Sequence, residues 1–320
     1  MVCFTEVQNQ MYAKLYEREQ QQQLVFTAVT YGSRRTSDQK ASRFVCKYRE
    51  IYDKSIPEFG KNGIQVGCMN SPMRSNESPG CDPHYCTENQ KHSPHSNDLI
   101  KHQTTAAYDT INTTIDQSFE QKLDKEAFEH LHDDELCNVY RSGVTNSKRI
   151  SSYGFIATFL NCKVTVDFDE TPMAEGMRRV LRHLYRVLQY GSLPSVMCYD
   201  KACSLYLFIR KHYNQENLQS LQRTEFVKNM TMAIDSFHVK NHNRPMCKTF
   251  MRPTHPSHNG IYDNINSQIA EQMFSYFSKF QNSFQGYHYP KSTVFFLLLF
   301  HLKNCRTVGL DTSEQSVFLT

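Results

Sequence analysis

The chain has 320 residues and a mass of 37.4 kDa, enough for one or two domains with a real hydrophobic core. Hydrophobic residues make up 39% and charged residues 21%, and the mean hydropathy of −0.60 indicates a soluble protein with polar stretches. The longest strongly apolar run, residues 294–300, is far shorter than the roughly 20 residues of a membrane-spanning helix. The N-terminus lacks the basic start and apolar run of a signal peptide. We therefore expect neither an integral membrane protein nor a secreted one.

The net charge of +4 hides a split between the two halves. Residues 151–310 carry 18 Lys/Arg against 10 Asp/Glu, whereas residues 1–150 carry 18 against 20. A basic C-terminal half favours a polyanion partner such as DNA. The eleven cysteines are scattered, which suits reduced thiols and metal ligands better than a disulfide framework. We expect a nuclear location, with the cytoplasm as the alternative.

The first part of the chain divides into three segments. Residues 1–65 begin with a helical pattern and contain a short strand at 28–31. Residues 66–110 are rich in Ser, Pro, Asn, His and Cys and cannot bury a core, so they form either a linker or a small region held by metal. Residues 111–149 are expected to be a helical connector, with its helix at about 115–136.

Residues 150–310 predict a packed α/β unit. Strands are expected at 153–160, 162–168, 195–199 and 230–235, and helices at 174–190, 202–212, 264–280 and 292–304. A tight turn at Asn161 joins the first two strands, and Gly191 ends the first helix. This alternation predicts an α/β sheet with parallel crossovers, whose ligands sit at the carboxyl ends of the strands.

Three carboxylates follow this pattern. Asp200 and Asp235 each come at the end of a predicted strand, and Glu271 lies inside a predicted helix. Carboxylates that converge in this way can hold Mg²⁺ or Mn²⁺ for two-metal phosphoryl transfer. The alternative is that Asp200 caps a helix and Glu271 is a solvated helix residue.

A second pattern is the H-x3-H-x4-C run formed by His238, His242 and Cys247. Imidazole and thiolate ligands suit Zn²⁺, with Cys203 or His258 as the fourth ligand. The alternative is that these histidines form hydrogen bonds with the backbone at the end of a strand.

A third pattern lies in the segment poor in apolar residues. Cys68, Cys81, Cys86 and His92, with Cys46 as a further candidate, could hold zinc in place of a hydrophobic core. The alternative is a linker with incidental cysteines. The chain has no phosphate-binding Gly-rich loop, no G-x-S-x-G elbow and no H-E-x-x-H, so no organic-cofactor residues are expected.

Three motifs carry a family resemblance, in the order CYDKAC (198–203), AIDSFHVKNHNRPMC (233–247) and NSQIAEQ (266–272). They resemble the core of KDZ-type (Kyakuja–Dileera–Zisupton) transposases, and more closely the transposon-derived segment of HMG-domain-containing-protein-3-like sequences. The Cys-rich stretch before them is similar to the module that precedes the core in such proteins. There the family has a Cys followed closely by His, whereas this chain has Cys86-Thr-Glu-Asn89, with His92 displaced.

The resemblance implies an RNase H-like core and a DDE-type mechanism, in which divalent ions assist in-line attack on a DNA phosphodiester. Asp200 would be the second catalytic carboxylate and Glu271 the third, and the 235–247 run would be structural or metal-binding. The stretch before Tyr153 offers no strand with the first catalytic Asp, so we expect an incomplete core, with Asp167 as the substitute.

Two functions follow from the resemblance. One is an active DDE-type DNA transposase, and the other is a non-catalytic DNA- or protein-binding remnant with structural zinc. DNA is the expected partner, a membrane is not, and a homo-oligomer is left open.

Overall fold

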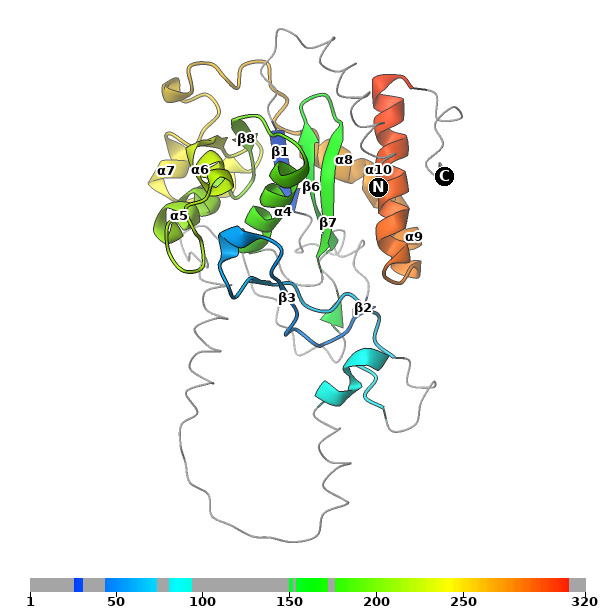
Figure 1. The fold of residues 1–320 in the computed structure, drawn as a ribbon. Coiled ribbons are helices and arrows are strands. Elements are labelled where there is room, and N and C mark those ends of the chain that lie inside the picture. The colour runs from blue at the N-terminus through cyan, green and yellow to red at the C-terminus, as the bar shows by residue number, and fades with distance from the viewer. Residues whose placement is uncertain are drawn as a thin grey trace.

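The computed structural model describes residues 26–30, 44–73, 81–93, 150–151, 154–171 and 176–310 (Figure 1). In this part of the chain, helices combine with one larger sheet and two small ones, next to a Cys-rich segment that is mostly irregular. The helices expected near the N-terminus and at 115–136 lie outside the described residues.

A five-stranded mixed sheet forms the centre of the fold (Figure 1). From one edge to the other, its strands are β7 (Thr165–Thr171), β6 (Gly154–Leu160), β1 (Phe26–Thr30), β8 (Val196–Cys198) and β9 (Thr231–Ala233). β6 runs antiparallel to both of its neighbours, whereas β1, β8 and β9 are parallel to one another. The carboxyl ends of β1, β8 and β9 therefore lie at the same edge of the sheet.

The central strand, β1, comes from a segment that the sequence analysis placed in the N-terminal region. All five of its residues pair with β6, from Phe26 opposite Leu160 to Thr30 opposite Ile156, and its first two residues also pair with β8. The sequence FTAVT has the β-branched and aromatic residues that strands favour. The strand expected at 28–31 thus exists but begins two residues earlier, and the sheet is not confined to residues 150–310.

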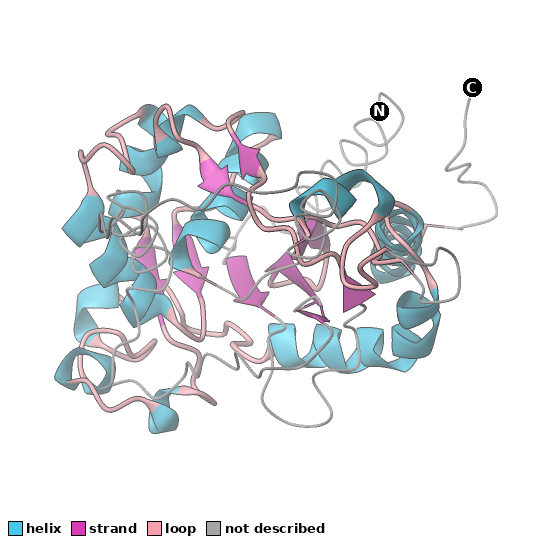
Figure 2. Cartoon of the chain, turned by 90° about the horizontal axis from the view of Figure 1, so that it is seen from below, coloured by secondary structure: helices cyan, strands magenta, loops and turns pink. Residues whose placement is uncertain are grey.

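Helices lie on both sides of the row of strands (Figure 2). They are α4 (Met177–Tyr190), α5 (Ala202–His212), α6 (Gln222–Asn229), α7 (Pro245–Lys248), α8 (Ile269–Phe277), α9 (Gln281–Gly286) and α10 (Lys291–Val308). The helix expected at 264–280 begins only at Ile269, because Asn264 has a left-handed backbone (φ 64°) and Asn266 accepts a hydrogen bond from the backbone of Gln268. None of the described helices has the length and apolar character needed to cross a membrane.

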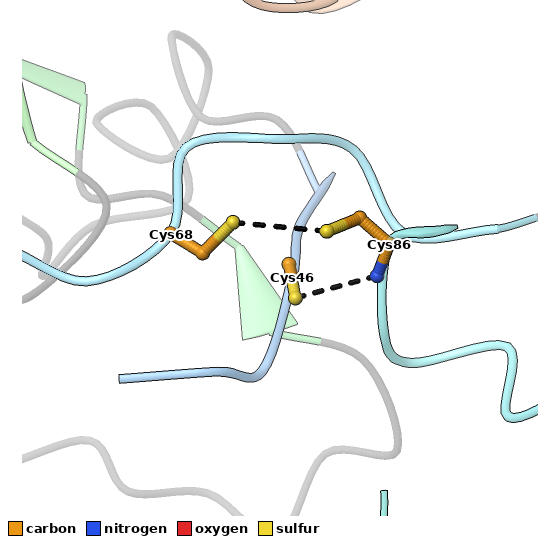
Figure 3. A group of neighbouring side chains, drawn as sticks. All are labelled: Cys46, Cys68 and Cys86. Atoms are coloured by element: carbon orange, nitrogen blue, oxygen red, sulfur yellow. Dashed lines mark hydrogen bonds between the residues drawn. The ribbon is translucent and has the colours of Figure 1, made fainter. Parts of the chain in front are cut away.

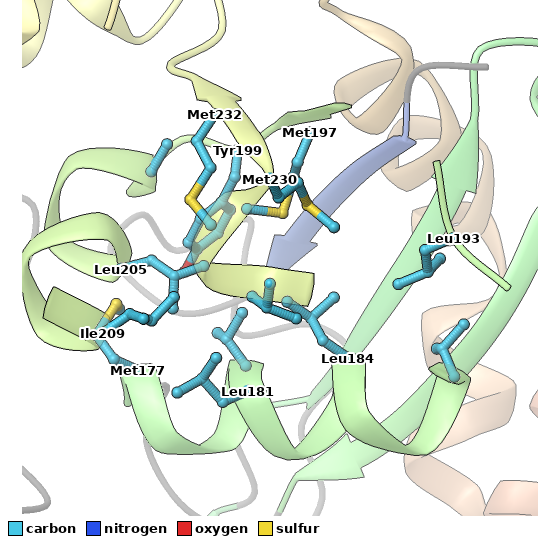
Figure 4. Packing of buried hydrophobic residues seen from close by; sticks show 14 of the residues in the cluster. Met177, Leu181, Leu184, Leu193, Met197, Tyr199, Leu205, Ile209, Met230 and Met232 are labelled. Atoms are coloured by element: carbon cyan, nitrogen blue, oxygen red, sulfur yellow. The ribbon is translucent and has the colours of Figure 1, made fainter. Parts of the chain in front are cut away.

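One layer of the core lies between the sheet and α4. Leu181 and Leu184 of α4 are fully buried and belong to one cluster with Met197 and Tyr199 from the β8 segment and Leu205 of α5 (Figure 4). Burying a side chain of this size stabilises the fold by about 1.5–3 kcal/mol relative to its exposure. This layer therefore holds β8 and its carboxyl end in place.

The other layer is aromatic. Phe155 of β6 has its ring centroid 4.6 Å from that of Phe296 and 5.5 Å from those of Phe274 and Phe300. These partners come from α8 and α10, so the cluster fixes both helices on the sheet face opposite α4. The fixed position of α8 matters because this helix carries Glu271.

The segment before the Cys-rich part belongs to the core rather than to a separate domain. Ile56, Phe59 and Ile64 are fully buried in the α4 cluster. Arg223 of α6 donates two hydrogen bonds to the buried carboxylate of Glu58, at 2.6 and 2.8 Å. The local elements are β3 (Tyr52–Asp53), which pairs with β4 (Ile64–Gln65), η2 (Pro57–Phe59), η3 (Thr87–His92), and β2 (Phe44–Val45), which pairs with β5 (Ile150–Ser151).

Candidate functional site

Acidic side chains gather at the carboxyl ends of two parallel strands. Asp200 lies two residues after β8, and Asp235 lies two residues after β9. Glu271 is in the first turn of α8. The fold therefore brings two strand ends and one helix to the edge of the sheet where α/β proteins bind ligands.

His238 links two of these carboxylates. Its Nδ1 forms a short hydrogen bond with the buried Asp235 and lies 3.3 Å from Oε1 of Glu271. The other oxygen of Asp235 accepts hydrogen bonds from the backbone N–H groups of Phe237 (2.6 Å) and His238 (3.2 Å). Oε2 of Glu271 is a buried atom with no hydrogen-bond partner in the described structure. These three side chains offer ligand atoms within 4.8 Å of one another, so they could hold a cation.

The charges around this group shift the pKa values of its members, and the charge of Asp200 contributes to these shifts. Burial lowers the pKa of His238, but the hydrogen bond to Asp235 and the charges of Asp235, Asp200 and Glu271 raise it to about 9. Burial raises the pKa of the Cys198 thiol well above its usual value, and the charges of Asp235, Glu271 and Asp200 add to this effect. The pKa of Glu271 is raised by its burial and by the charge of Asp235. His238 is thus grouped with Asp235 and Glu271, and Asp200 lies outside this group and acts on it through its charge.

Asp167 is not brought to this cluster. It lies on β7, at the opposite edge of the sheet from β9, and groups with Asp169 and with His183 of α4. Its side chain points to the α4 face, because the next residue, Phe168, packs on Phe296 and Phe300 of α10 on the other face. The expected substitute for the first carboxylate therefore has a different place in the fold.

The strand beside β8 carries no carboxylate. β1 pairs in parallel with β8, with Phe26 opposite Met197 and Thr27 opposite Cys198. Its residues are Phe, Thr, Ala, Val and Thr, and the next residue in the sequence is Tyr31. The position next to Asp200 in the sheet is thus filled by a strand that cannot supply an acidic ligand.

The H-x3-H-x4-C run divides between two sites. His242 and Cys247 lie with Cys203 of α5 in a fully buried group, in which Sγ of Cys203 is 3.4 Å from Nδ1 of His242. His238 belongs to the acidic cluster instead, because the short 3₁₀ helix η4 (Val239–Asn241) turns the chain between the two histidines. Cys203 and His258 were the two candidates for a further ligand at this site. The Nε2 atom of His258 instead contacts the carbonyl of Phe250 at 2.7 Å, so only Cys203 lies in the group.

A third group consists of three buried thiols (Figure 3). Sγ of Cys68 lies 3.9 Å from Sγ of Cys86, and Sγ of Cys46 accepts a hydrogen bond from the backbone of Cys86 at 3.3 Å. The hydrogen bond with Cys68 and those from the backbone lower the pKa of Cys46 to about 5, against the effect of its burial. A tetrahedral zinc ion with zinc–sulfur distances of about 2.3 Å separates its sulfurs by about 3.8 Å, so this spacing fits zinc.

Two of the residues predicted for this third site are not part of it. Cys81 is exposed, and the ring of His92 stacks on that of Tyr48 with centroids 4.2 Å apart. Cys46, which the sequence analysis offered only as a further candidate, is a member. Cys46 lies far from the other cysteines in the sequence, which concealed this role. The backbone N–H groups of Lys47 and Met73 donate hydrogen bonds to the carbonyls of residues 84 and 85, and these bonds bring the three segments together.

A basic segment adjoins the acidic cluster. Residues 236–262 contain four Lys/Arg and no Asp/Glu. Lys240, Lys248 and Arg252 are exposed, and the ammonium of Lys240 lies 4.7 Å from the ring centroid of Phe237, which is 47% exposed. A surface with exposed cations and an exposed aromatic ring has the chemistry that binds nucleic acid. No protein-family model, curated protein or solved structure matches this chain.

Proposed function

We propose that this chain is a transposase-derived protein with an RNase H-like core, which binds DNA in the nucleus, contains structural zinc and has lost strand cleavage. The observation that carries the proposal is the order of the sheet. The strands lie side by side in the order β7-β6-β1-β8-β9. If the five are numbered by their order along the chain, this is third, second, first, fourth and fifth, and only the second strand runs antiparallel to the others. An RNase H-like fold has the same strand order, so this order supports the proposal together with the motifs at 198–272.

The absence of a carboxylate on β1 supports the loss of catalysis. Two-metal phosphoryl transfer uses ions that bridge the attacking and leaving oxygens, and acidic ligands hold these ions in position. Asp200 and Glu271 would be two such ligands, but the first strand has no acidic residue to be the third. The short hydrogen bond from His238 also occupies one oxygen of Asp235, beside the position that a divalent ion would take.

The basic segment supports DNA binding. It follows β9 closely in the chain, and β9 ends at the edge of the sheet where an RNase H-like protein would meet its nucleic acid. The group of Cys203, His242 and Cys247 anchors this segment to α5. Zinc at this group would hold the cations in a fixed arrangement, which lowers the entropic cost of binding.

The experiment for DNA binding measures affinity for duplex DNA by fluorescence anisotropy over a range of salt concentrations. The variant K240Q/K248Q/R252Q should bind more weakly, and the slope of log K against log salt should fall by about 2 to 3, near 0.9 for each lost phosphate contact. The matched control is K279Q/K291Q/R306Q, which removes three exposed cations from the α8–α10 side. Equal losses in both variants would mean that net charge alone, and not this segment, binds DNA.

The loss of cleavage has its own experiment. The purified protein should not nick supercoiled plasmid in Mn²⁺. Nicking that disappears in Asp200→Ala and in Glu271→Ala would show an active DDE-type enzyme and overturn this part of the proposal. Nicking that survives both changes would come from another source, such as a contaminating nuclease.

A further inference from the structure

The side chain of Asn89 lies over the three thiols of Cys46, Cys68 and Cys86. Its Nδ2 atom is 3.1 Å from Sγ of Cys86, 3.2 Å from Sγ of Cys68 and 3.7 Å from Sγ of Cys46. Asn89 is itself buried, with 8% exposure. One side-chain atom thus approaches all three sulfurs at once.

Local structure explains this position. Cys86 precedes the first residue of η3, and Asn89 is the third residue of that helix. In a 3₁₀ helix, side chains three residues apart lie on the same side. The geometry therefore aims the amide of Asn89 at the same point as the thiol of Cys86.

The distances are those of a tetrahedral metal site. An oxygen at about 2.1 Å from zinc lies about 3.6 Å from sulfurs that are about 2.3 Å from the ion. The three measured distances, 3.1 to 3.7 Å, and the 3.9 Å between two sulfurs are close to these edges. A half-turn about the Cβ–Cγ bond exchanges the amide nitrogen and oxygen, so Oδ1 can occupy the fourth corner.

We propose that Asn89 is the fourth ligand of a zinc site with Cys46, Cys68 and Cys86, and binds the metal through its amide oxygen. This inference rests on the structural zinc of the proposed function. On binding, each thiol that is still protonated gives up its proton, and three zinc–sulfur bonds and one zinc–oxygen bond form. A neutral amide oxygen is a weaker zinc ligand than imidazole, so the site binds zinc less tightly than a Cys₃His site.

Substitutions at Asn89 separate this role from the alternative, in which the amide only donates hydrogen bonds to the sulfurs. Asn89→Asp keeps an oxygen at the fourth corner but removes the N–H donors. If Asn89 is a ligand, the affinity for zinc should follow the order His and Asp above Asn, with Ala below Asn, and the ¹¹³Cd resonance of wild type should differ from that of the Ala variant. If Asn89 is only a donor, the ¹¹³Cd resonance of wild type should match that of the Ala variant, because the amide is then not among the ligands of the metal.

The measurement uses the full chain, with zinc affinity from chelator competition and donor atoms from ¹¹³Cd NMR. Each bound cadmium gives its own resonance, so the site at Cys203, His242 and Cys247 is observed separately. Asn89→His should shift one resonance only, because nitrogen replaces oxygen at one site. Cys81→Ser is the control and should change neither affinity nor resonance, since Cys81 is exposed and outside the cluster.

The outcomes separate the presence of zinc at the three thiols from the role of Asn89. If the wild-type chain binds no metal at the three thiols, structural zinc at this site fails, and the inference fails with it. If the wild-type chain binds metal but the Asp, His and Ala variants match it in affinity and resonance, the zinc stands and only the role of Asn89 is refuted. If Asn89→Ala does not fold, Asn89→Leu takes its place in the comparison, because it has a similar size and neither donates nor ligates.

Discussion

Asp169→Asn should destabilise the protein and change how its stability depends on pH. The carboxylate of Asp169 is buried, lies 2.9 Å from Nδ1 of His183 and 3.2 Å from Nη1 of Arg182, and forms a short ion pair with Arg186. His183 has no exposed surface, and its Nε2 is 2.7 Å from Oγ1 of Thr158. Removal of the negative charge leaves two arginines and a histidine without their shared partner.

The magnitude follows from the pKa. Burial alone would raise the pKa of Asp169, but the hydrogen bond and charge of His183 and the two arginines lower it from 3.8 to about 2. A difference of about 1.8 units, at 1.36 kcal/mol per unit, is about 2 kcal/mol of stability. Breaking a buried ion pair by removing one partner costs about 3–5 kcal/mol. We therefore expect Asp169→Asn to lower the free energy of unfolding at pH 7 by about 2 to 5 kcal/mol.

The sign of the pH effect is fixed by the direction of the shift. Because the folded-state pKa is lowered, the contribution of Asp169 is complete above the unfolded-state pKa of 3.8 and is lost as pH falls toward 2. Urea unfolding followed by circular dichroism between pH 7 and pH 2 measures this. Wild type should lose about 2 kcal/mol more than Asp169→Asn between pH 5 and pH 2.

Asp167→Asn is the matched control, two residues away on the same strand. Its pKa is raised, mainly by burial and further by the charge of Asp169, so its ionised form opposes folding at neutral pH. This substitution should leave the stability at pH 7 unchanged or increase it. Similar destabilisation by both variants would refute the reasoning, because it would show that only packing matters at this place.

Three further substitutions, two of them paired with a control variant, test local contacts of the fold by urea unfolding. Phe296→Ala should cost about 3–5 kcal/mol because it opens the aromatic cluster, whereas Val294→Ala on the exposed side of α10 should stay within about 0.5 kcal/mol. Asn304→Ala should cost about 1–3 kcal/mol and reduce amide protection at the start of β7. The side chain of Asn304 accepts a hydrogen bond from the backbone N–H of Thr165 and donates one to its carbonyl, both at 2.8 Å. Gly60→Ala should cost more than Gly309→Ala: both have positive φ, but only at Gly60 would a Cβ lie 2.4 Å from a backbone oxygen. Equal costs in either pair would contradict these contacts.

Local sequence patterns predicted the helices and strands of the core well. The helix expected at 202–212 is α5 with the same limits, and strands exist at each place where residues 150–310 predicted one. Apolar periodicity and flanking Gly or Pro depend on near neighbours only, so they can be read from the chain. The short helix α6 (Gln222–Asn229) was missed because its sequence, QRTEFVKN, has few apolar positions.

The sites were harder to predict, because contact between distant segments decides them. Asp200 and Glu271 both act on His238 through the fold, although their separation in sequence carries no sign of it. Conversely, His238 and His242 are close in sequence but belong to different clusters, because η4 turns the chain between them. Motif spacing thus identified the residues that carry chemistry but not the groups that they form.

The central place of β1 provides the most direct test of the fold. A chain that begins at residue 24 keeps β1, whereas a chain that begins at residue 32 loses it. Both lack residues 1–23, so the comparison isolates the strand. Without β1, the facing edges of β6 and β8 lose their backbone hydrogen bonds and expose a gap in the middle of the sheet. The longer chain should unfold cooperatively in urea, and the shorter chain should aggregate or show no cooperative transition. Equal midpoints for the two chains would mean that residues 150–310 form the sheet by themselves, and the order that supports an RNase H-like core would be wrong.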